Sequence, residues 1–155
     1  MDEAFKQYIE SLHPPFEKLL AMRPIKISNL PKDLPSKCIY LFSEGEKHFY
    51  VGRTNRFRSR MRQHSIPGAL HNQAVFAFKL ARKMTGRLSA TYKMEGSRVA
   101  LARDATFSAS FLEMKARVRG MDLRFIEEVD PLRQTLLEIY VAVVLKTPYN
   151  DFDTH

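Results

Sequence analysis

The sequence predicts an α+β domain in which helices flank a small three-stranded antiparallel or mixed sheet. Two short segments rich in aromatic and β-branched residues, "KCIYLFS" and "KHFYVG", are separated only by "EGE", which predicts a β-hairpin with a three-residue loop. A later segment, "MDLRFIEEV", alternates apolar and polar side chains, as a half-buried strand does. Amphipathic helical patterns precede, separate and follow these strands.

The first part of the chain, residues 1–34, predicts a helical N-terminal extension and a linker. Apolar residues recur at helical spacing from position 2 to position 22, Pro14 and Pro15 interrupt the pattern, and further prolines mark the extended linker. Residues 35–155 are then expected to form one globular unit.

Helical patterns occupy most of the remaining sequence. Thr54 or Asn55 can cap a helix that turns Phe57 and Met61 inward. We expect two more helices, over residues 70–84 and about 99–118, within a helical insertion at about 65–117, and an exposed basic loop at 87–98 between them. Asp130 and Pro131 then begin the last helix, "PLRQTLLEIYVAVVLK".

Charge and cysteine content restrict the partners and the compartment. The 155 residues include 25 Lys+Arg and 17 Asp+Glu, a net charge of +8, which favours a polyanion as partner, nucleic acid first and acidic lipid second. Cys38 is the only cysteine, so an internal disulfide is excluded. The acidic start lacks the features of a signal peptide, and "IYVAVVL" is too short to span a membrane. We therefore expect a cytoplasmic protein that does not bind membranes.

Tyr40 and Tyr50 form the first candidate pair. With a three-residue loop they would face each other across the hairpin, and their hydroxyls would share one face. Cross-strand aromatic pairs are also common for packing reasons alone, so the hairpin by itself assigns them no chemistry.

A dense run of arginines follows the hairpin at once. Arg56, Arg60 and His64 are four residues apart, so they are expected to project from one helix face. No acidic residue interleaves to relieve the repulsion, which favours contact with phosphates; the alternative is a solvated basic face. The five arginines are Arg53, Arg56, Arg58, Arg60 and Arg62.

Glu138 is the only charged residue in the apolar stretch "LLEIYVAVVL". A carboxylate removed from water without a partner is costly, so Glu138 needs a cation, an arginine or exposure. It either marks the one solvated side of the last helix or binds a hard divalent cation such as Mg²⁺.

Together these residues resemble the GIY-YIG nuclease superfamily, which includes homing endonucleases, some restriction enzymes and the incision subunit of bacterial nucleotide excision repair. "CIY" is followed after nine residues by "YVG", and Arg60 lies ten residues after Tyr50, with Glu138 in a late helix and Asn150 beyond it. The resemblance covers about residues 38–150, interrupted by the insertion. Cys38 replaces the first glycine of the motif, and valine replaces the central isoleucine of the second half.

The resemblance implies a GIY-YIG-like fold and a role for each matched residue. Tyr40 becomes the candidate base and Tyr50 positions water or phosphate, Arg60 is the catalytic arginine, His64 an additional catalytic histidine, and Glu138 the metal ligand. Nucleic-acid contacts are expected from Arg53, Arg56, Arg58, Arg62 and Asn150, the last of which also closes the site.

The implied activity is hydrolysis of DNA phosphodiester bonds by an endonuclease that uses one Mg²⁺ or Mn²⁺ ion and no small-molecule cofactor, in repair or restriction. A homodimer or a partner protein could supply specificity. One alternative is a nucleic-acid-binding module that keeps the fold without catalysis, and another is a basic domain that binds membrane surfaces or proteins.

Overall fold

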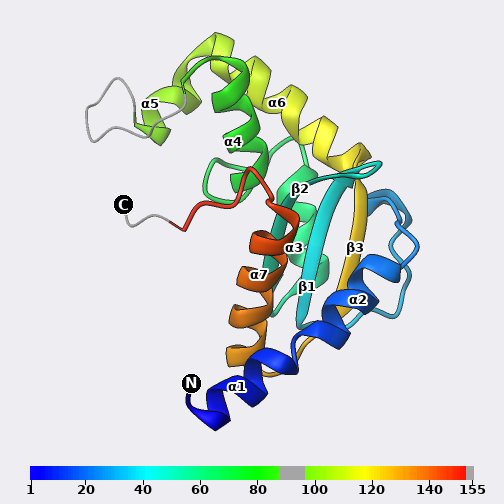
Figure 1. The fold of residues 1–155 in the computed structure, drawn as a ribbon. Coiled ribbons are helices and arrows are strands. Elements are labelled where there is room, and N and C mark those ends of the chain that lie inside the picture. The colour runs from blue at the N-terminus through cyan, green and yellow to red at the C-terminus, as the bar shows by residue number, and fades with distance from the viewer. Residues whose placement is uncertain (88–96, 153–155) are drawn as a thin grey trace. The chain divides into compact units, whose positions relative to one another are not determined.

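The computed structural model describes residues 1–87 and 97–152 and confirms the α+β class (Figure 1). Its three strands form one antiparallel sheet in the order β2-β1-β3. The strands are β1 (Cys38–Glu44), β2 (Lys47–Thr54) and β3 (Asp122–Glu127). The helices are α1 (Glu3–Glu10), α2 (His13–Ala21), the short 3-10 helix η1 (Ile27–Asn29), α3 (Phe57–Ser65), α4 (Val75–Met84), α5 (Arg98–Arg103), α6 (Ala105–Gly120) and α7 (Pro131–Leu145).

The chain divides into two compact units where the sequence predicts a single one. The first unit comprises Met1–Arg58 and Met121–His155, and the second comprises Ser59–Gly120. The second unit therefore begins earlier than the predicted insertion at 65–117, within α3.

No helix of residues 1–87 and 97–152 is both long and apolar enough to cross a membrane.

One face of the sheet in the first unit carries a hydrophobic core. The predicted N-terminal extension belongs to this core, because side chains of its helices pack with α7 and the sheet. The buried members of this core are Leu12, Phe16, Leu19, Ile39, Leu41, Val51, Leu137, Val141 and Ala142.

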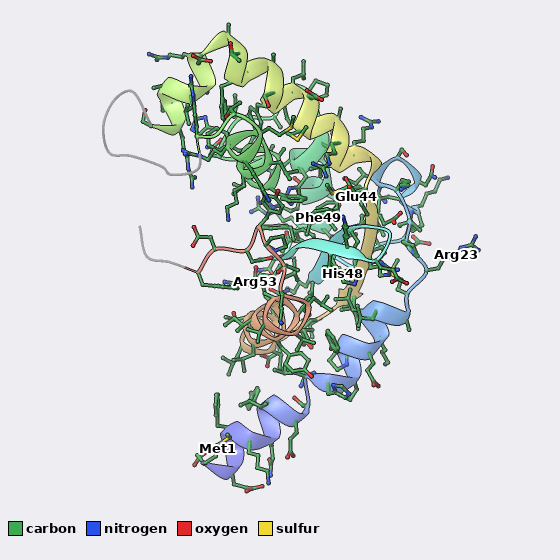
Figure 2. The ribbon with its side chains drawn as sticks, turned by 45° about the horizontal axis from the view of Figure 1, so that its top comes forward. Met1, Arg23, Glu44, His48, Phe49 and Arg53 are labelled. Atoms are coloured by element: carbon green, nitrogen blue, oxygen red, sulfur yellow. The ribbon has the colours of Figure 1, made fainter. Side chains whose placement is uncertain are left out.

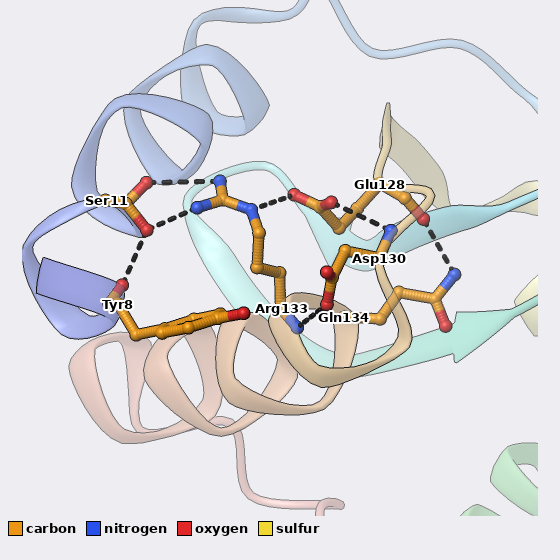
Figure 3. A network of polar contacts seen from close by, with 6 residues as sticks. All are labelled: Tyr8, Ser11, Glu128, Asp130, Arg133 and Gln134. Atoms are coloured by element: carbon orange, nitrogen blue, oxygen red, sulfur yellow. Dashed lines mark hydrogen bonds and ion pairs between the residues drawn. The ribbon is translucent and has the colours of Figure 1, made fainter. Parts of the chain in front are cut away.

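A polar network ties the N-terminal helices to the start of α7 (Figure 3). Asp130 caps α7 by accepting a hydrogen bond from the backbone N–H of Arg133 at 2.9 Å, as the sequence predicts. The Arg133 guanidinium donates to Glu128 Oε2 at 3.0 Å and to both the hydroxyl and the carbonyl oxygen of Ser11. Glu128 is thus neutralised where α1 and α2 meet α7.

The hairpin register differs from the prediction. Glu44 pairs with Lys47, so the loop has two residues, and Gly45 takes the positive φ of 61° that its first position requires. A bulge between Phe42 and Ser43 then shifts the pairing. Tyr40 consequently faces Gly52, and Tyr50 faces Phe42. The expected direct pairing of Tyr40 with Tyr50 is wrong.

The second unit contains α4, α5 and α6, and two of its predicted helix bounds are wrong. The helix expected from residue 70 begins at Val75, because the Gln73 side chain accepts from the backbone N–H of Leu70 and stabilises a turn. The helix expected over about 99–118 is broken at Asp104, whose carboxylate accepts from the N–H of Phe107 at 2.8 Å and caps α6. The predicted basic loop at 87–98 falls almost entirely outside the described residues.

Candidate functional site

The two candidate tyrosines lie diagonally on one face of the hairpin. Their ring centroids are 6.4 Å apart, and the ring of Tyr40 also contacts Phe42 and Phe57. Tyr40 is buried, whereas Tyr50 is half-buried. Tyr40 is therefore fixed by its neighbours, and Tyr50 is the one of the two with more access to solvent.

Gly52 provides the space for the Tyr40 ring. A Cβ atom at position 52 would overlap the ζ carbon and hydroxyl oxygen of Tyr40 and would lie 2.9 Å from its Cε2. The glycine of "YVG" is thus required by a close approach between a ring and the backbone.

Replacing Gly52 with alanine should destabilise the protein by about 1–3 kcal/mol, because the buried Tyr40 ring has to move out of its packed position. Urea unfolding followed by circular dichroism measures this change. Gly68→Ala is the matched control, since a Cβ at position 68 meets nothing within 4 Å. Equal stability of the two variants would contradict the packing argument.

Glu138 and Arg53 form an ion pair between α7 and β2 (Figure 2 labels Arg53). Arg53 Nε donates to Glu138 Oε2 at 3.0 Å, and the side chains are 46% and 19% exposed, respectively. Side chains two residues apart in a strand lie on the same face of the sheet, so Arg53 shares the face of Val51. Val51 packs with residues of α7. The carboxylate that the sequence marks as anomalous thus has an arginine partner.

Burial raises the pKa of Glu138 above its ordinary value, and the charge of Arg53 and its hydrogen bond offset part of that rise. The native state therefore binds more protons than the unfolded state in the pH range just above the ordinary pKa of a glutamate. An ionised Glu138 lowers the stability of the fold.

The free energy of unfolding of the wild type, compared with that of Glu138→Gln, should fall as the pH rises from about 4 to about 7. Only the wild type has at position 138 a carboxyl group with a raised pKa, and this group loses its proton in that range. Urea unfolding of both proteins across this pH range measures the difference. Glu17→Gln, at an exposed position of α2, controls for the loss of a surface charge. A difference that stays constant or grows with pH would contradict the prediction.

Asn150 closes the outer edge of β2. Its Oδ1 accepts from the backbone N–H of Val51 at 2.9 Å and from the Thr147 hydroxyl at 2.7 Å, while its Nδ2 donates to the Val51 carbonyl at 2.7 Å. The Tyr149 N–H donates to the Phe49 carbonyl at 3.2 Å. These hydrogen bonds replace those of a neighbouring strand and fix the C-terminal segment beside Phe49 and Val51, the two neighbours of Tyr50 in the chain. Contact of Asn150 with nucleic acid stays a prediction.

The other arginines of the run have different surroundings. Arg58 donates through Nη2 to the carbonyl oxygens of Pro31 and Lys32, so it holds the linker of the first unit. Arg56 and Arg62 are exposed on α3. Their contacts with DNA remain predictions.

Arg60 and His64 belong to the second unit. Arg60 is half-buried and donates through Nη1 to Gln63 Oε1 at 3.2 Å and to the Gln73 carbonyl at 2.8 Å. His64 is buried, and burial first and the charge of Arg60 second lower its pKa well below the ordinary value. At neutral pH it is therefore uncharged.

The expectation that His64 lies on an exposed cationic face is wrong. Phe57, Met61 and His64 follow one another after four and three residues, which places all three on the inward side of α3. The spacing of Arg56, Arg60 and His64 would also allow His64 to lie on the same face as the two arginines. Its burial shows that it lies on the inward face instead. The catalytic role of His64 stays a prediction.

The structure thus brings together Tyr40 with Tyr50 and Arg53 with Glu138, on opposite faces of the hairpin in the first unit. Convergence of these residues with Arg60 stays a prediction. Within residues 1–87 and 97–152, no three His, Cys, Asp or Glu side chains gather as a metal-binding group. Sequence reasoning did not identify the role of Gly52, although its position in "YVG" was the available signal.

Comparison with protein-family models, with curated proteins and with solved structures found no match.

Proposed function

We propose that the protein is a divalent-metal-dependent endonuclease that hydrolyses DNA phosphodiester bonds. The observation that carries the proposal is Glu138, a largely buried carboxylate with a raised pKa inside an apolar helix. An ionised group that lowers the stability of the fold is characteristic of functional sites, where activity is retained at a cost in stability.

In this proposal Glu138 holds a single hard cation. Mg²⁺ is commonly held by one or two protein carboxylates and keeps several waters, so it does not need a cluster of acidic ligands. Arg53 engages Oε2 of Glu138, and Oε1 is the atom we assign to the metal. A bound Mg²⁺ or Mn²⁺ would supply Lewis-acid stabilisation of negative charge on phosphate oxygens.

The cationic residues bind and orient the DNA in this proposal. Arg53 is nearly half exposed at the end of β2, so its guanidinium can hold a phosphate oxygen beside Glu138. The catalytic role that the family resemblance implies for Arg60, whose guanidinium is a planar and permanently charged fork, stays a prediction. Exposed Arg56 and Arg62 hold the flanking backbone and make binding salt-dependent.

Neither tyrosine is assigned as the base beside Glu138 in this proposal, because both lie on the face of the hairpin opposite the pair of Arg53 and Glu138. Tyr40 is buried against Phe42 and Phe57, while Tyr50 is half-buried. The catalytic roles that the family resemblance implies for the two tyrosines therefore stay predictions, and Tyr50 is the one with better access to water.

A nucleic-acid-binding module without catalysis is the second candidate. The ion pair between Arg53 and Glu138 favours it, since an arginine already neutralises the carboxylate that would otherwise hold the metal. Under this alternative the ion pair is purely structural, and the basic residues serve binding alone.

Incubation of the purified full chain with supercoiled plasmid separates these candidates. Nicking that requires Mg²⁺ or Mn²⁺ and stops with EDTA is the result expected for the endonuclease. Branched, flapped and single-stranded DNA belong in the same panel, because the target structure is not specified by the site. Salt-dependent binding without cleavage of any of these substrates would overturn the endonuclease and favour the binding module.

A further inference from the structure

The positive charge of the chain is concentrated in its second unit. Of the 25 Lys+Arg, 12 lie in residues 59–120 together with only 3 of the 17 Asp+Glu, so this unit carries a net charge of +9. The first unit has 13 Lys+Arg and 14 Asp+Glu, a net charge of −1. The excess charge that favours a polyanion as partner therefore belongs to the second unit.

Three arginines of this unit gather around the end of α4. Arg82 donates through Nη1 to the backbone carbonyl of Arg87 at 3.1 Å. Burial first and the charge of Arg98 second lower the pKa of Arg82, so the start of α5 lies close to it. We call Arg82, Arg87 and Arg98 the arginine cluster. Asp104, which lies 3.5 Å from Arg87, is the one carboxylate among the described residues that pairs with it.

Arg82 is a buried cation without a carboxylate partner in the described part of the chain. It is 6% exposed, and its guanidinium carbon lies 5.0 Å from the ring centroid of Phe78. Its Nη2 is buried and makes no hydrogen bond within residues 1–87 and 97–152. A buried charge that no opposite charge neutralises costs stability, and such groups are characteristic of functional sites. An anion bound at the arginine cluster would supply the missing negative charge.

The other two members make the arginine cluster accessible. Arg87 and Arg98 are both exposed, and Arg98 forms no hydrogen bond or ion pair with any residue that the structure describes. The side chains of Arg87 and Asp104 are 45% and 36% exposed, and an ion pair this open to water contributes little. A phosphate can therefore replace the carboxylate, and its oxygens can bind more than one guanidinium at once.

The surroundings favour DNA over a membrane as the source of the phosphate. A helix that binds an anionic membrane needs an exposed apolar side beside its basic residues. Most apolar residues of α4 are buried, and α5 has only six residues. A unit with a net charge of +9 instead suits a continuous row of phosphates. We propose that the arginine cluster binds phosphates of the DNA backbone. The choice of DNA rests on the proposed function, in either of its two forms.

Fluorescence anisotropy of the full chain with a labelled DNA duplex tests the proposal, in EDTA so that metal-dependent cleavage does not occur. Arg87→Gln/Arg98→Gln should raise the Kd at least about tenfold, because it removes both exposed members of the arginine cluster. Arg98→Gln alone should lower the slope of log Kd against log salt concentration by about one. Lys18→Gln/Arg23→Gln removes two exposed basic residues from the first unit and should change the Kd less than about twofold (Figure 2 labels Arg23).

Arg82→Met tests the buried member of the arginine cluster. It should weaken DNA binding without lowering the free energy of unfolding, because an apolar side chain replaces a buried charge that no carboxylate neutralises in the free protein. Urea unfolding and the same anisotropy measurement give the two quantities. Wild-type DNA affinity combined with a loss of stability would show that Arg82 only packs against Phe78, and would overturn its part in the proposal.

A double variant Arg87→Gln/Arg98→Gln that binds the duplex as tightly as the wild type would overturn the proposal, even if the wild type nicks plasmid. A wild type that needs these arginines for binding but never nicks DNA would support the proposal and overturn only the endonuclease. Vesicles that contain phosphatidylserine, measured in parallel by co-sedimentation, give the remaining comparison. Vesicle binding that requires Arg87 and Arg98, with DNA binding that does not, would overturn DNA in favour of a lipid surface.

Discussion

Glu138→Gln should reduce metal-dependent DNA cleavage at least about a hundredfold, because the amide cannot supply a negative oxygen to the divalent cation. The fold should persist, since glutamine has nearly the same shape and its oxygen can still accept the hydrogen bond from Arg53 Nε. The measurement is the initial rate of plasmid nicking in Mg²⁺, with DNA binding measured in parallel by fluorescence anisotropy. Binding should be retained or slightly strengthened, because a negative charge near Arg53 is removed.

Glu17→Gln is the control for this experiment, because it removes a carboxylate from an exposed position of α2 and should cleave at the wild-type rate. Cleavage by Glu138→Gln at more than about a tenth of the wild-type rate would remove Glu138 from the proposed metal site. Parallel loss of binding and cleavage would instead indicate that Glu138 supports the DNA-binding surface through Arg53.

The strands and the core-forming helices could be predicted because their signals are local. The aromatic runs before and after "EGE", the alternation in "MDLRFIEEV" and the Asp-Pro start of the last helix each depend on residues close in sequence. The register could not be predicted in the same way. It depends on the conformation of Gly45 and on the bulge beyond it, and both are compatible with the same apolar pattern.

The candidate site shows the same division between local and distant signals. Glu138 was identifiable as a charge in an apolar helix that needs a cation, but its partner Arg53 is 85 residues away in sequence, and no local pattern connects the two. His64 fits two helical spacings, and only burial beside Phe57 and Met61 excludes the exposed one. Asp104 breaks a continuous helical pattern because its side chain caps α6, a choice that the apolar periodicity does not reveal.

Arg133→Leu should cause the largest loss of stability among the substitutions considered, about 3–5 kcal/mol, because it leaves Glu128 buried without a cation. The two side chains are 26% and 10% exposed, so water can replace little of the lost interaction. The same change removes the hydrogen bonds that attach Ser11 to the start of α7.

Urea unfolding at neutral pH measures this effect, and Arg23→Leu, at an exposed arginine, is the matched control. The double variant Glu128→Gln/Arg133→Leu should recover part of the loss, since it removes the unpaired charge along with its former partner. The recovery distinguishes the cost of a buried charge from the cost of detaching the N-terminal helices, because only the first is relieved. A single variant within about 1 kcal/mol of the control would show instead that Glu128 regains water when Arg133 is removed, and that the network shown in Figure 3 contributes little to the fold.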